Sequence, residues 1–550
     1  MEKPFAITLE VETSLANHTG SWRVERPQYV NLMPPCNNAC PAGENIQNWL
    51  YVAEDGSYEA AWKSLIIENP FPAIMGRVCY HPCQTACNRA QLDEAVGINS
   101  VERFLGDLAI EKGWAIPVTA PPSGFHVLII GSGPAGLSAA YHLRKLGHEV
   151  TVREAANALG GMMRWGIPKY RLPREVLDAE IKRISDMGVH FELNTRVDDL
   201  RAALKEGFNA IFLAVGAHIG KRAYIPAGEA AHILDAINVL HDVEDGQAPM
   251  LGRKVVVYGG GNTAIDVART AKRLGAEESI IVYRRTRDKA PANDTEIKEA
   301  LEEGVLIKWL STIKHAEVGK LRVEKMILDE KGFPQPTGEF EELAADSLVL
   351  ALGQESDLSL LKDVPDLEVE DGVVKVNAMM MTTHAGIFAG GDMVPAERTV
   401  TTGVGHGKSA ARNIDAWLQS TEYVGHDKQQ IVEFKDLNPW YYSDAPHAVR
   451  PRLEGARRAS TFDEVVQGLD ESTALYEARR CMSCGNCFEC DNCFGVCPDN
   501  AVIKLGSGLG FEINLDYCKG CGICVSECPA GSIVMITRRP SSGRSRCRRG

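Results

Sequence analysis

The chain has 550 residues, enough for several domains, and 45% of them are hydrophobic, as in ordinary globular proteins. A formal net charge of −14 argues against a general nucleic-acid-binding protein. No apolar run approaches a membrane span, and the first residues lack a signal-peptide pattern. We therefore expect a cytoplasmic protein whose 16 cysteines, many only two or three residues apart, bind metal and do not form disulfides.

The first motif is a group of five cysteines near the N-terminus: Cys36, Cys40, Cys79, Cys83 and Cys87. Residues 46–53 and 58–68, which lie between them, show amphipathic helical periodicity. Gaps of three residues, with a proline after one cysteine, are typical of iron–sulfur ligands, and buried free thiols are the alternative. We therefore expect a helical iron–sulfur domain over residues 1–116.

A glycine-rich turn organises the next part of the chain. Its residues are Gly131, Ser132, Gly133, Pro134, Ala135 and Gly136. An apolar β-type run over 125–130 precedes it, a helical run follows it, and a second β-type run over 149–153 is followed by Glu154. Glycines permit a tight turn close to a pyrophosphate, and the helix N-terminus favours its negative charge. Because Glu154 is also placed to accept hydrogen bonds from ribose hydroxyls, the order predicts a dinucleotide-binding unit, with a purely structural turn as the alternative.

A second unit of the same kind follows. After the β-type run over 255–258, the turn contains Gly259, Gly260, Gly261, Asn262 and Thr263. The next β-type run, 279–283, ends in Arg284 and Arg285 instead of an acid. Arginines at this position suit the 2′-phosphate of NADP, whereas an acid suits the free hydroxyl of NAD. The alternative is that both arginines simply face solvent.

Two further segments carry features that a bound cofactor explains. Gly160 and Gly161 predict a close approach of the backbone to a ligand. Asp392 comes soon after the apolar run 387–389. Its carboxylate is expected to bind a cofactor hydroxyl or, alternatively, to act as a helix cap. The N-terminus of the helix expected over 408–418 is placed to stabilise negative charge on the cofactor ring.

The C-terminal part carries the pattern C-x2-C-x2-C-x3-C-P twice. In this two-cluster bacterial ferredoxin pattern, three cysteines of each run bind one cluster and the fourth binds the other. The first expected set is Cys487, Cys490, Cys493 and Cys528. The second is Cys497, Cys518, Cys521 and Cys524. Zinc is the alternative, but zinc sites do not need an eight-cysteine duplication. A helix over 461–480 is expected to lead into this module.

Taken together, these motifs resemble the glutamate synthase small-subunit family, whose relatives include the flavin half of dihydropyrimidine dehydrogenase and NADPH:ferredoxin transhydrogenase subunits. The matching stretches are residues 36–87, 131–136, 160–168, 259–266, 283–285 and 390–392. The resemblance implies FAD at the first glycine turn and NADPH at the second, with NADH as the alternative nucleotide. The FAD-binding residues that it implies are Gly131, Gly133, Pro134, Ala135, Gly136, Glu154, Gly161, Arg164, Gly216, Gly391, Asp392 and Thr402. The NADPH-binding residues are Gly259, Gly260, Gly261, Asn262, Thr263, Arg284 and Arg285.

The same resemblance implies the fold class and the order of the domains. We expect an α/β multidomain protein with an N-terminal α-helical iron–sulfur domain, two Rossmann-like domains of the glutathione-reductase type, and an α+β ferredoxin-like domain. The expected segments after residue 116 are 117–235 and 355–421 for FAD, 236–354 for NADPH, a connector over 422–480, the ferredoxin domain over 481–537 and a basic, disordered tail over 538–550.

One feature departs from the family pattern, because no cysteine precedes Cys36, where family members usually carry a C-x2-C pair. Cys481 and Cys484 are not needed by the ferredoxin repeat. One N-terminal cluster is expected from Cys40, Cys79, Cys83 and Cys87. We hypothesise a further cluster bound by Cys36, Cys481, Cys484 and Glu102, since Glu102 matches the position of a glutamine ligand in dihydropyrimidine dehydrogenase. The chain would then hold four [4Fe–4S] clusters, or three if Cys481 and Cys484 are buried thiols.

The expected activity is that of an FAD- and iron–sulfur-dependent NAD(P)H oxidoreductase. Hydride moves between NADP(H) and FAD, and single electrons move through the clusters to a partner protein docked at the ferredoxin domain. No acid–base catalytic residue is required, and the flavin-binding stretches contain no C-x-x-C of a disulfide reductase. We expect a subunit of a larger complex, of the 2-oxoacid:ferredoxin oxidoreductase or glutamate synthase type. The alternatives are a stand-alone NADPH:ferredoxin reductase and a scaffold without hydride chemistry, against which both intact glycine turns argue.

Overall fold

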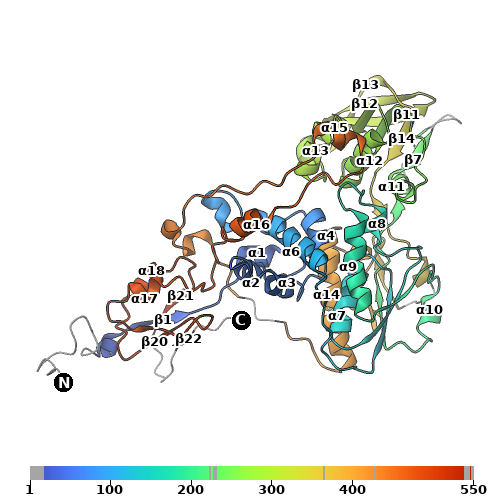
Figure 1. Cartoon of the computed structure of the whole chain (residues 1–550). Helices are drawn as coiled ribbons and strands as arrows, with labels where there is room; N and C mark the ends of the chain where they lie inside the picture. The colour runs from blue at the N-terminus through green and yellow to red at the C-terminus, as the bar shows by residue number, and fades with distance from the viewer. Residues whose placement is uncertain are drawn as a thin grey trace, which may run out of the picture.

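The computed structural model describes residues 18–221, 225–226, 232–362, 364, 366–425 and 429–537, and the backbone of residues 545–546. The helical N-terminal module lies between the nucleotide-binding modules and the ferredoxin-like module, so the molecule is elongated (Figure 1). Among the described residues, no helix is long and apolar enough to cross a membrane.

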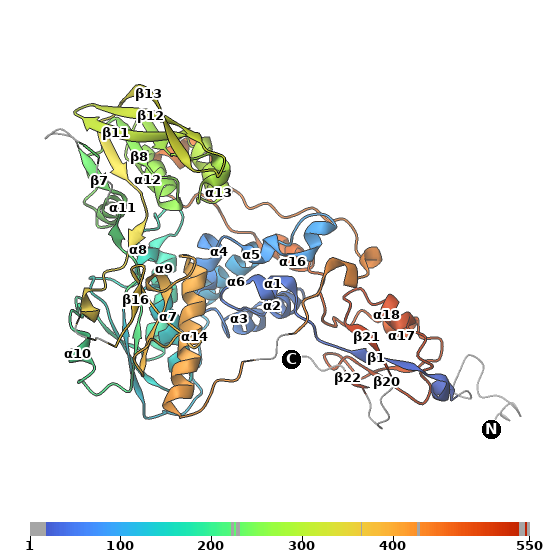
Figure 2. The ribbon, with the colours of Figure 1, turned by 180° about the vertical axis from the view of Figure 1, so that it is seen from behind.

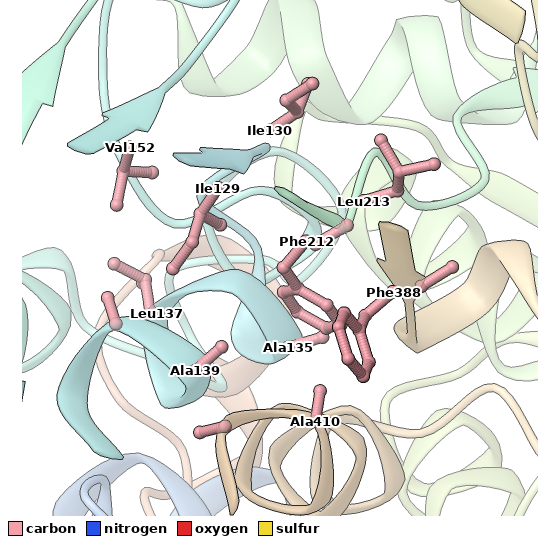
Figure 3. Close-up of a cluster of buried hydrophobic side chains, with 14 of the residues drawn as sticks. Ile129, Ile130, Ala135, Leu137, Ala139, Val152, Phe212, Leu213, Phe388 and Ala410 are labelled. Carbon is pink, nitrogen blue, oxygen red and sulfur yellow. The ribbon is translucent and has the colours of Figure 1, made fainter. Parts of the chain in front are cut away.

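The first nucleotide-binding module is built on a parallel sheet with strand order β18-β5-β2-β3-β4. Its strands are β2 (His126–Ile130), β3 (Glu149–Arg153), β4 (His190–Glu192), β5 (Ala210–Leu213) and β18 (Ile387–Ala389). Helices α7 (Pro134–Lys145) and α14 (Val400–Leu418) pack against each other beneath it. Ile129, Phe212 and Phe388 extend from the strands toward these helices and are fully buried (Figure 3). Each such side chain stabilises the layer by about 1.5–3 kcal/mol.

The second nucleotide-binding module has the strand order β10-β9-β8-β14-β7, again parallel. Its strands are β7 (Ile233–Asp235), β8 (Lys254–Tyr258), β9 (Glu278–Val282), β10 (Leu306–Lys308) and β14 (Ser347–Leu350). Its helices are α11 (Ala236–Glu244), α12 (Asn262–Arg273) and α13 (Asp294–Glu302). A second, antiparallel sheet consists of β11 (Ser311–Glu317), β12 (Lys320–Leu328) and β13 (Pro334–Ala344). Side chains alternate along β8, so Val255 and Val257 pack in the core with α12, whereas Val256 packs in the core with the antiparallel sheet.

The N-terminal module is helical, as expected. Its helices are α1 (Pro35–Ala39), α2 (Ile46–Ala53), α3 (Tyr58–Leu65), α4 (Pro72–Val78), α5 (Pro82–Thr85) and α6 (Ile98–Lys112). Helices α4 and α6 cross so closely that a Cβ added at Gly106 would lie 2.2 Å from the Ala73 nitrogen. Glu180 of helix α9 (Arg174–Asp186) accepts hydrogen bonds from the Ala73 and Ile74 amides at the start of α4. The carboxylate therefore fixes the helical module to the first nucleotide-binding module.

The ferredoxin-like module contains two short helices, each beside a cysteine run. Its elements are α17 (Asn492–Gly495), α18 (Ile523–Ser526), β19 (Val502–Lys504), β20 (Phe511–Ile513), β21 (Ile533–Thr537) and β22 (Ser545–Arg546). Strand β1 (Glu25–Tyr29) pairs antiparallel with β21, with Glu25 opposite Thr537. The first described residues therefore belong to this module and not to the helical domain expected over 1–116. Spacing along the sequence cannot show a pairing between opposite ends of the chain.

The connector, residues 422–480, crosses three modules (Figures 1 and 2). Helix α15 (Gly455–Ser460) packs on α12, and helix α16 (Glu471–Ala478) packs on α6. The helix expected over 461–480 is therefore shorter. It begins after Asp470, whose side chain accepts the Thr473 amide hydrogen bond as an N-cap.

Several short elements complete the described chain. They are α8 (Met162–Trp165), α10 (Leu200–Ala203), β6 (Ile219–Gly220), β15 (Gln354–Glu355), β16 (Val369–Glu370) and β17 (Val373–Val374). The expected boundary at 235/236 lies too late, because β7 already belongs to the second nucleotide-binding sheet. Apart from β22, the expected basic tail over 538–550 lies outside the described residues.

Candidate functional site

The first glycine turn joins β2 to α7 with very little space around its backbone. Gly131 has a φ of +103°, and a Cβ added there would lie 2.4 Å from the Ala214 carbonyl oxygen. A Cβ at Gly136 would lie 2.0 Å from the Gly131 oxygen. A Cβ at Gly133 would meet nothing within 4 Å, so this glycine borders open space. The turn is therefore tight on its protein side and open on the side where a pyrophosphate would lie.

Glu154 lies next to this turn, at the end of β3. Its carboxylate accepts hydrogen bonds from the Ser132 amide at 2.9 Å and the Ser132 hydroxyl at 2.6 Å. Gly161 has a φ of +52°, and a Cβ there would lie 2.7 Å from the Gly133 Cα. The close approach expected at Gly161 is thus to the glycine turn itself.

The second glycine turn joins β8 to α12. A Cβ at Gly260 would lie 2.4 Å from the ring of Tyr283, which follows β9. Exposed Arg284 and half-buried Arg285 come next, at the carboxyl edge where the adenosine ribose of a bound dinucleotide lies. The Arg285 guanidinium lies 5.8 Å from the ring centroid of Phe333.

One cavity of about 710 Å³ connects the two turns. Its first end is lined by residues of the first unit, including Gly131, Gly133, Pro134, Ala135, Glu154, Gly161, Gly216, Gly391 and Asp392. Its other end is lined by Gly261, Asn262, Thr263, Asp266 and Gln354. Two dinucleotides bound at these turns would therefore meet in one enclosed space.

Aromatic and charged pairs cross this cavity from one nucleotide-binding module to the other. The rings of Trp165 and His241 are stacked, with centroids 4.5 Å apart. Arg171 binds Asp266 of α12 at 2.7 Å and also forms an ion pair with Glu296. These contacts set the distance between the two nucleotide sites.

Asp392 occupies the floor of the cavity near the N-terminus of α14. Burial raises the pKa of its carboxyl, while Arg398 opposes that effect. The neighbouring Gly391 amide donates to His406 Nδ1 at 3.1 Å, and burial lowers the pKa of His406. His406 is therefore a neutral acceptor that fixes the backbone beside Asp392.

Some expected nucleotide-binding side chains do not line the cavity. Arg164 pairs with Asp178 and donates from Nε to the Leu159 carbonyl at 2.6 Å. The Thr402 hydroxyl shares a hydrogen bond of 2.8 Å with Thr399. The remaining expected residues outside the lining are Gly136, Gly259, Gly260, Arg284 and Arg285.

The ferredoxin-like module brings the eight repeat cysteines together in two groups. Cys487, Cys490, Cys493 and Cys528 line one small cavity. The electrostatic neighbours of Cys524 include Cys518, Cys521 and Cys497, which form the other group. Cys490 and Cys521 are exposed, one in each group. The groups are those that the repeat predicts.

The N-terminal cysteines group differently from the expectation. Burial raises the pKa of Cys83, and the thiols of Cys79 and Cys40 and the carboxyl of Glu102 raise it further. Cys87 instead lines a separate cavity together with Cys36, Cys481 and Cys484. Cys87 and Glu102 have thus exchanged places relative to the sets expected above. The reason is that Cys83 lies in α5, whereas Cys87 follows it in extended conformation, with φ −64° and ψ 123°.

The helical module also reaches the nucleotide cavity. Val78 and Tyr80, which flank Cys79, both line it. The Thr401 hydroxyl of α14 donates to the Met75 sulfur at 3.5 Å, on the helix that ends directly before Cys79. The first cysteine group therefore lies directly behind the wall of the nucleotide cavity.

Comparison with known proteins accounts for this arrangement. A family model described as pyridine nucleotide-disulphide oxidoreductase matches residues 125–410. The chain belongs to this family. Two further models, dihydropyrimidine dehydrogenase domain II with a 4Fe–4S cluster and a 4Fe–4S binding domain, match residues 25–114 and 511–534. These matches confirm the predicted oxidoreductase class, with its flavin, pyridine nucleotide and iron–sulfur cofactors.

Several curated proteins are similar over most of the chain. The NADP(+)-dependent formate dehydrogenase subunit beta of Moorella thermoacetica is 34% identical over 82% of this chain and 70% of its own length. The NADPH-Fe(3+) oxidoreductase subunit beta of Geobacter sulfurreducens is 33% identical over 82% of this chain and 75% of its own. The glutamate synthase [NADPH] small chain of Azospirillum brasilense is 32% identical over 70% and 87%, respectively. The predicted resemblance to the glutamate synthase small chain is confirmed, and these relatives are subunits of larger enzymes.

The family name refers to disulfide substrates, but the nucleotide-binding modules of this chain have no cysteine that could form a redox-active disulfide. Residues 88–480 contain no cysteine. Sequence reasoning also missed Tyr80, Trp165, Arg171 and His241, which line the cavity. Only Trp165 lay within a motif, the glycine-containing segment 160–168, and nothing in the spacing indicated that its ring would stack on His241.

Proposed function

We propose that this oxidoreductase is the electron-transfer subunit of a larger complex, passing electrons between NADP(H) and a partner protein by way of FAD and a row of iron–sulfur clusters. The observation that carries the proposal is the single cavity lined by both glycine turns and by Val78 and Tyr80, which flank Cys79. When bound, the cofactors supply hydride transfer at the flavin and one-electron steps at the clusters. A stand-alone NADPH:acceptor reductase is the alternative, and isolation of the native assembly distinguishes the two.

The residues present fit these cofactors. Glycines leave room for a pyrophosphate at each turn, and each turn leads into a helix N-terminus that favours its charge. Arg284 and Arg285 provide the positive charge that a 2′-phosphate requires. The ring of Tyr283, which directly precedes these two arginines, lies against Gly260 of the second glycine turn. We therefore propose NADPH as the preferred nucleotide.

We propose three iron–sulfur sites from the cysteines that do not line the cavity shared by Cys36, Cys87, Cys481 and Cys484. The two ferredoxin sites are proposed from the eight repeat cysteines. The third is proposed from Cys40, Cys79, Cys83 and Glu102. Burial, with Glu44 and Glu180 nearby, raises the pKa of Glu102. Carboxylate and thiolate groups together fit an iron centre next to the flavin.

The exposed end of the ferredoxin-like module is the proposed contact for the partner. Cys490 and Cys521 reach its surface. Trp440, 86% exposed, follows Asn438, whose side chain donates to the Ser526 carbonyl of this module. Exposed aromatic side chains are typical of protein interfaces. None of the fifteen described cysteines forms a disulfide, which suits the cytoplasm that we propose as the location.

The test follows the electrons in the full-length protein under anaerobic conditions. Cys521→Ser removes a ligand of the outermost site, and Ser526→Ala is the matched control on the exposed face of the same helix region. NADPH should reduce the flavin equally in both variants. Delivery to a bacterial ferredoxin used as acceptor should fall at least about tenfold only in Cys521→Ser, because one missing ligand disables a cluster. Unchanged delivery would show that electrons leave elsewhere, and failure of flavin reduction in the wild type would overturn the proposed function.

A further inference from the structure

Four cysteines from three distant segments meet in one small, mostly apolar cavity between the helical module and the connector. Cys36 is on α1, Cys87 follows α5, and Cys481 and Cys484 follow α16. None of the four belongs to the ferredoxin repeat or to the group around Cys83. The matched family models cover residues 25–114 and 511–534, so neither includes both halves of this group.

The turn that carries Cys481 and Cys484 is held in place by the helical module. The Leu32 amide donates to the Gly485 carbonyl at 3.0 Å, and Gln47 Nε2 donates to Ser483 Oγ at 3.2 Å. Arg89 donates to the Arg480 carbonyl at 2.8 Å. Each of these contacts joins the N-terminal part of the chain to residues 480–485, where the connector meets the ferredoxin segment. Together they hold the turn against the helical module.

The backbone of this turn is strained in a way that directs the thiols. Ser483 has a φ of +46°, a left-handed conformation that costs about 1 kcal/mol or more for a residue other than glycine. It is 2% exposed, so the strain is maintained by packing. The conformation brings Cys481 and Cys484 to the same cavity, and Asn88 Nδ2 donates to the Cys484 sulfur at 3.7 Å. An amide donor on a sulfur is the arrangement that stabilises a metal-bound thiolate.

We propose that Cys36, Cys87, Cys481 and Cys484 together hold a [4Fe–4S] cluster, with two ligands from the helical module and two from the turn that directly follows the connector. On binding, each thiol loses its proton and its sulfur binds one iron of the preassembled cluster. Four protons are released and no electron is transferred in that step. The C-x2-C pair missing before Cys36 is thus replaced by one from the other end of the chain.

The position of the site favours a cluster over zinc. The Tyr442 hydroxyl interacts electrostatically with thiols of both groups, Cys481 and Cys484 as well as Cys490 and Cys528 of the ferredoxin-like module, and these raise its pKa. Its hydroxyl donates to the Met482 carbonyl at 3.0 Å. The new site therefore lies between the cysteine group behind the nucleotide cavity and the ferredoxin-like module. A redox-inactive ion would interrupt that row, whereas a cluster continues it. Only this use of the site rests on the proposed function.

The site has a second consequence for the architecture. The ferredoxin-like module is linked to the rest of the molecule by the segments around residues 30–36, 429–437 and 481–487. A cluster with ligands at Cys36 and Cys481 joins the first and the last of these segments through metal–sulfur bonds. Cluster binding therefore stabilises the docking of the ferredoxin-like module on the helical module.

The experiment is a double-mutant test on the full-length protein, reconstituted and purified without oxygen. The variants are Cys36→Ser, Cys481→Ser and the two combined. If both residues bind one cluster, each single variant loses about four irons and four sulfides, and the combined variant loses no more. Each also loses the same signal from the electron paramagnetic resonance spectrum of the reduced protein. Cys36→Ser combined with Cys40→Ser is the comparison pair, and its losses should add to about eight irons because the two residues belong to different sites.

Other outcomes overturn the proposal. Additive losses for Cys36→Ser and Cys481→Ser would place the residues in different sites, and unchanged iron would remove the site. Loss of one zinc in place of iron would identify a different metal. If the variants do not fold, the wild type still decides, because four clusters require about 16 irons and three require about 12. Flavin reduction by NADPH in the same samples reports on the proposed function separately.

Discussion

The Thr401 hydroxyl on α14 donates a hydrogen bond to Met75 Sδ on α4 at 3.5 Å. Val400 and Gly403, on either side of Thr401 along α14, line the nucleotide cavity. The bond therefore connects the wall of the proposed flavin site to α4, the helix that ends directly before Cys79 of the first cysteine group. In the proposed electron path this is the contact between the two-electron and one-electron parts of the molecule.

Replacement of Thr401 by Val should lower the reduction potential of the cluster proposed at Cys79, because the Thr401 side chain lowers the pKa of that thiol and so stabilises its thiolate. Hydrogen bonds to sulfur raise such potentials, because they stabilise the more negative reduced state. One net hydrogen bond is worth about 1 kcal/mol, which corresponds to roughly 40 mV for one electron. A redox titration followed by electron paramagnetic resonance measures the shift. Thr421→Val, at the other end of α14, is the control, because its hydroxyl bonds to the Ala416 carbonyl. Equal potentials in both variants would contradict the assignment.

The arginine pair after β9 gives a test of nucleotide choice. Replacing both Arg284 and Arg285 by Ala should raise the KM for NADPH at least about tenfold, since charged hydrogen bonds are worth about 1.5–3 kcal/mol. The KM for NADH should change little, because NADH has no 2′-phosphate. Arg253→Ala provides the control, as this exposed arginine pairs with Glu277 away from the turn. Steady-state kinetics with both nucleotides decides, and a parallel change in both KM values would show that the arginines do not read the phosphate.

Glu180 gives the stability a predictable pH dependence. Burial raises the pKa of this fully buried carboxyl to about 7, while Arg183 and the Ala73 and Ile74 amides oppose the increase. The folded state therefore binds more protons than the unfolded state between about pH 4.5 and pH 7. The free energy of unfolding should fall as the pH rises through this window, by up to about 3 kcal/mol from this group.

The variant Glu180→Gln removes this titration. Its melting temperature should depend less on pH between 5 and 8 than that of the wild type, with the difference confined to that window. Differential scanning fluorimetry measures both proteins. Glu175→Gln on the exposed face of the same helix is the control. A wild type that becomes more stable from pH 5 to pH 7 relative to Glu180→Gln would reverse the sign and refute the argument.

The sequence predicts the nucleotide turns well because their information is local. Gly131 and Gly259 stand directly after buried strands, and the acceptor Glu154 and the donors Arg284 and Arg285 follow at the carboxyl edge. The structure adds the contacts between residues that are far apart in the sequence. The stacking of Trp165 on His241 depends on how two modules sit together, which no spacing records.

The cysteine groups also show that spacing along the sequence does not determine which side chains lie together. The ferredoxin repeat predicts its own sets, because the duplicated spacing gives three cysteines of one run and the fourth of the other. In the helical module, Cys83 and Cys87 are four residues apart, yet they face different groups because α5 ends between them. Glu102 joins Cys40 and not Cys36, because Asn69 Nδ2, which donates to Glu102 at 2.9 Å, also donates to Glu44. Such side-chain packing decides which of these residues lie together.

The connector provides the last prediction. Arg458 of α15 lies 2.9 Å from Glu302 and 3.4 Å from Glu303 of the second nucleotide-binding module. Close by, Arg273 Nε donates to the Thr461 carbonyl at 3.1 Å. Further along, Glu464 pairs with Arg77 of the helical module at 2.8 Å. These contacts tie the NADPH-binding module to the helical module through the connector.

Arg458→Ala should release this part of the connector. Glu303 keeps Arg269 and Arg273 as partners, so the module itself should remain folded. The loss of one buried arginine contact should cost about 1–3 kcal/mol locally. Amide hydrogen exchange over residues 452–466 should therefore become about 5- to 100-fold faster, while α12 keeps its protection. Arg457→Ala is the control, because that exposed arginine pairs only locally with Asp463. If hydrogen exchange becomes equally faster in both variants, or also becomes faster across α12, the Arg458 contacts do not specifically hold the connector to the second nucleotide-binding module.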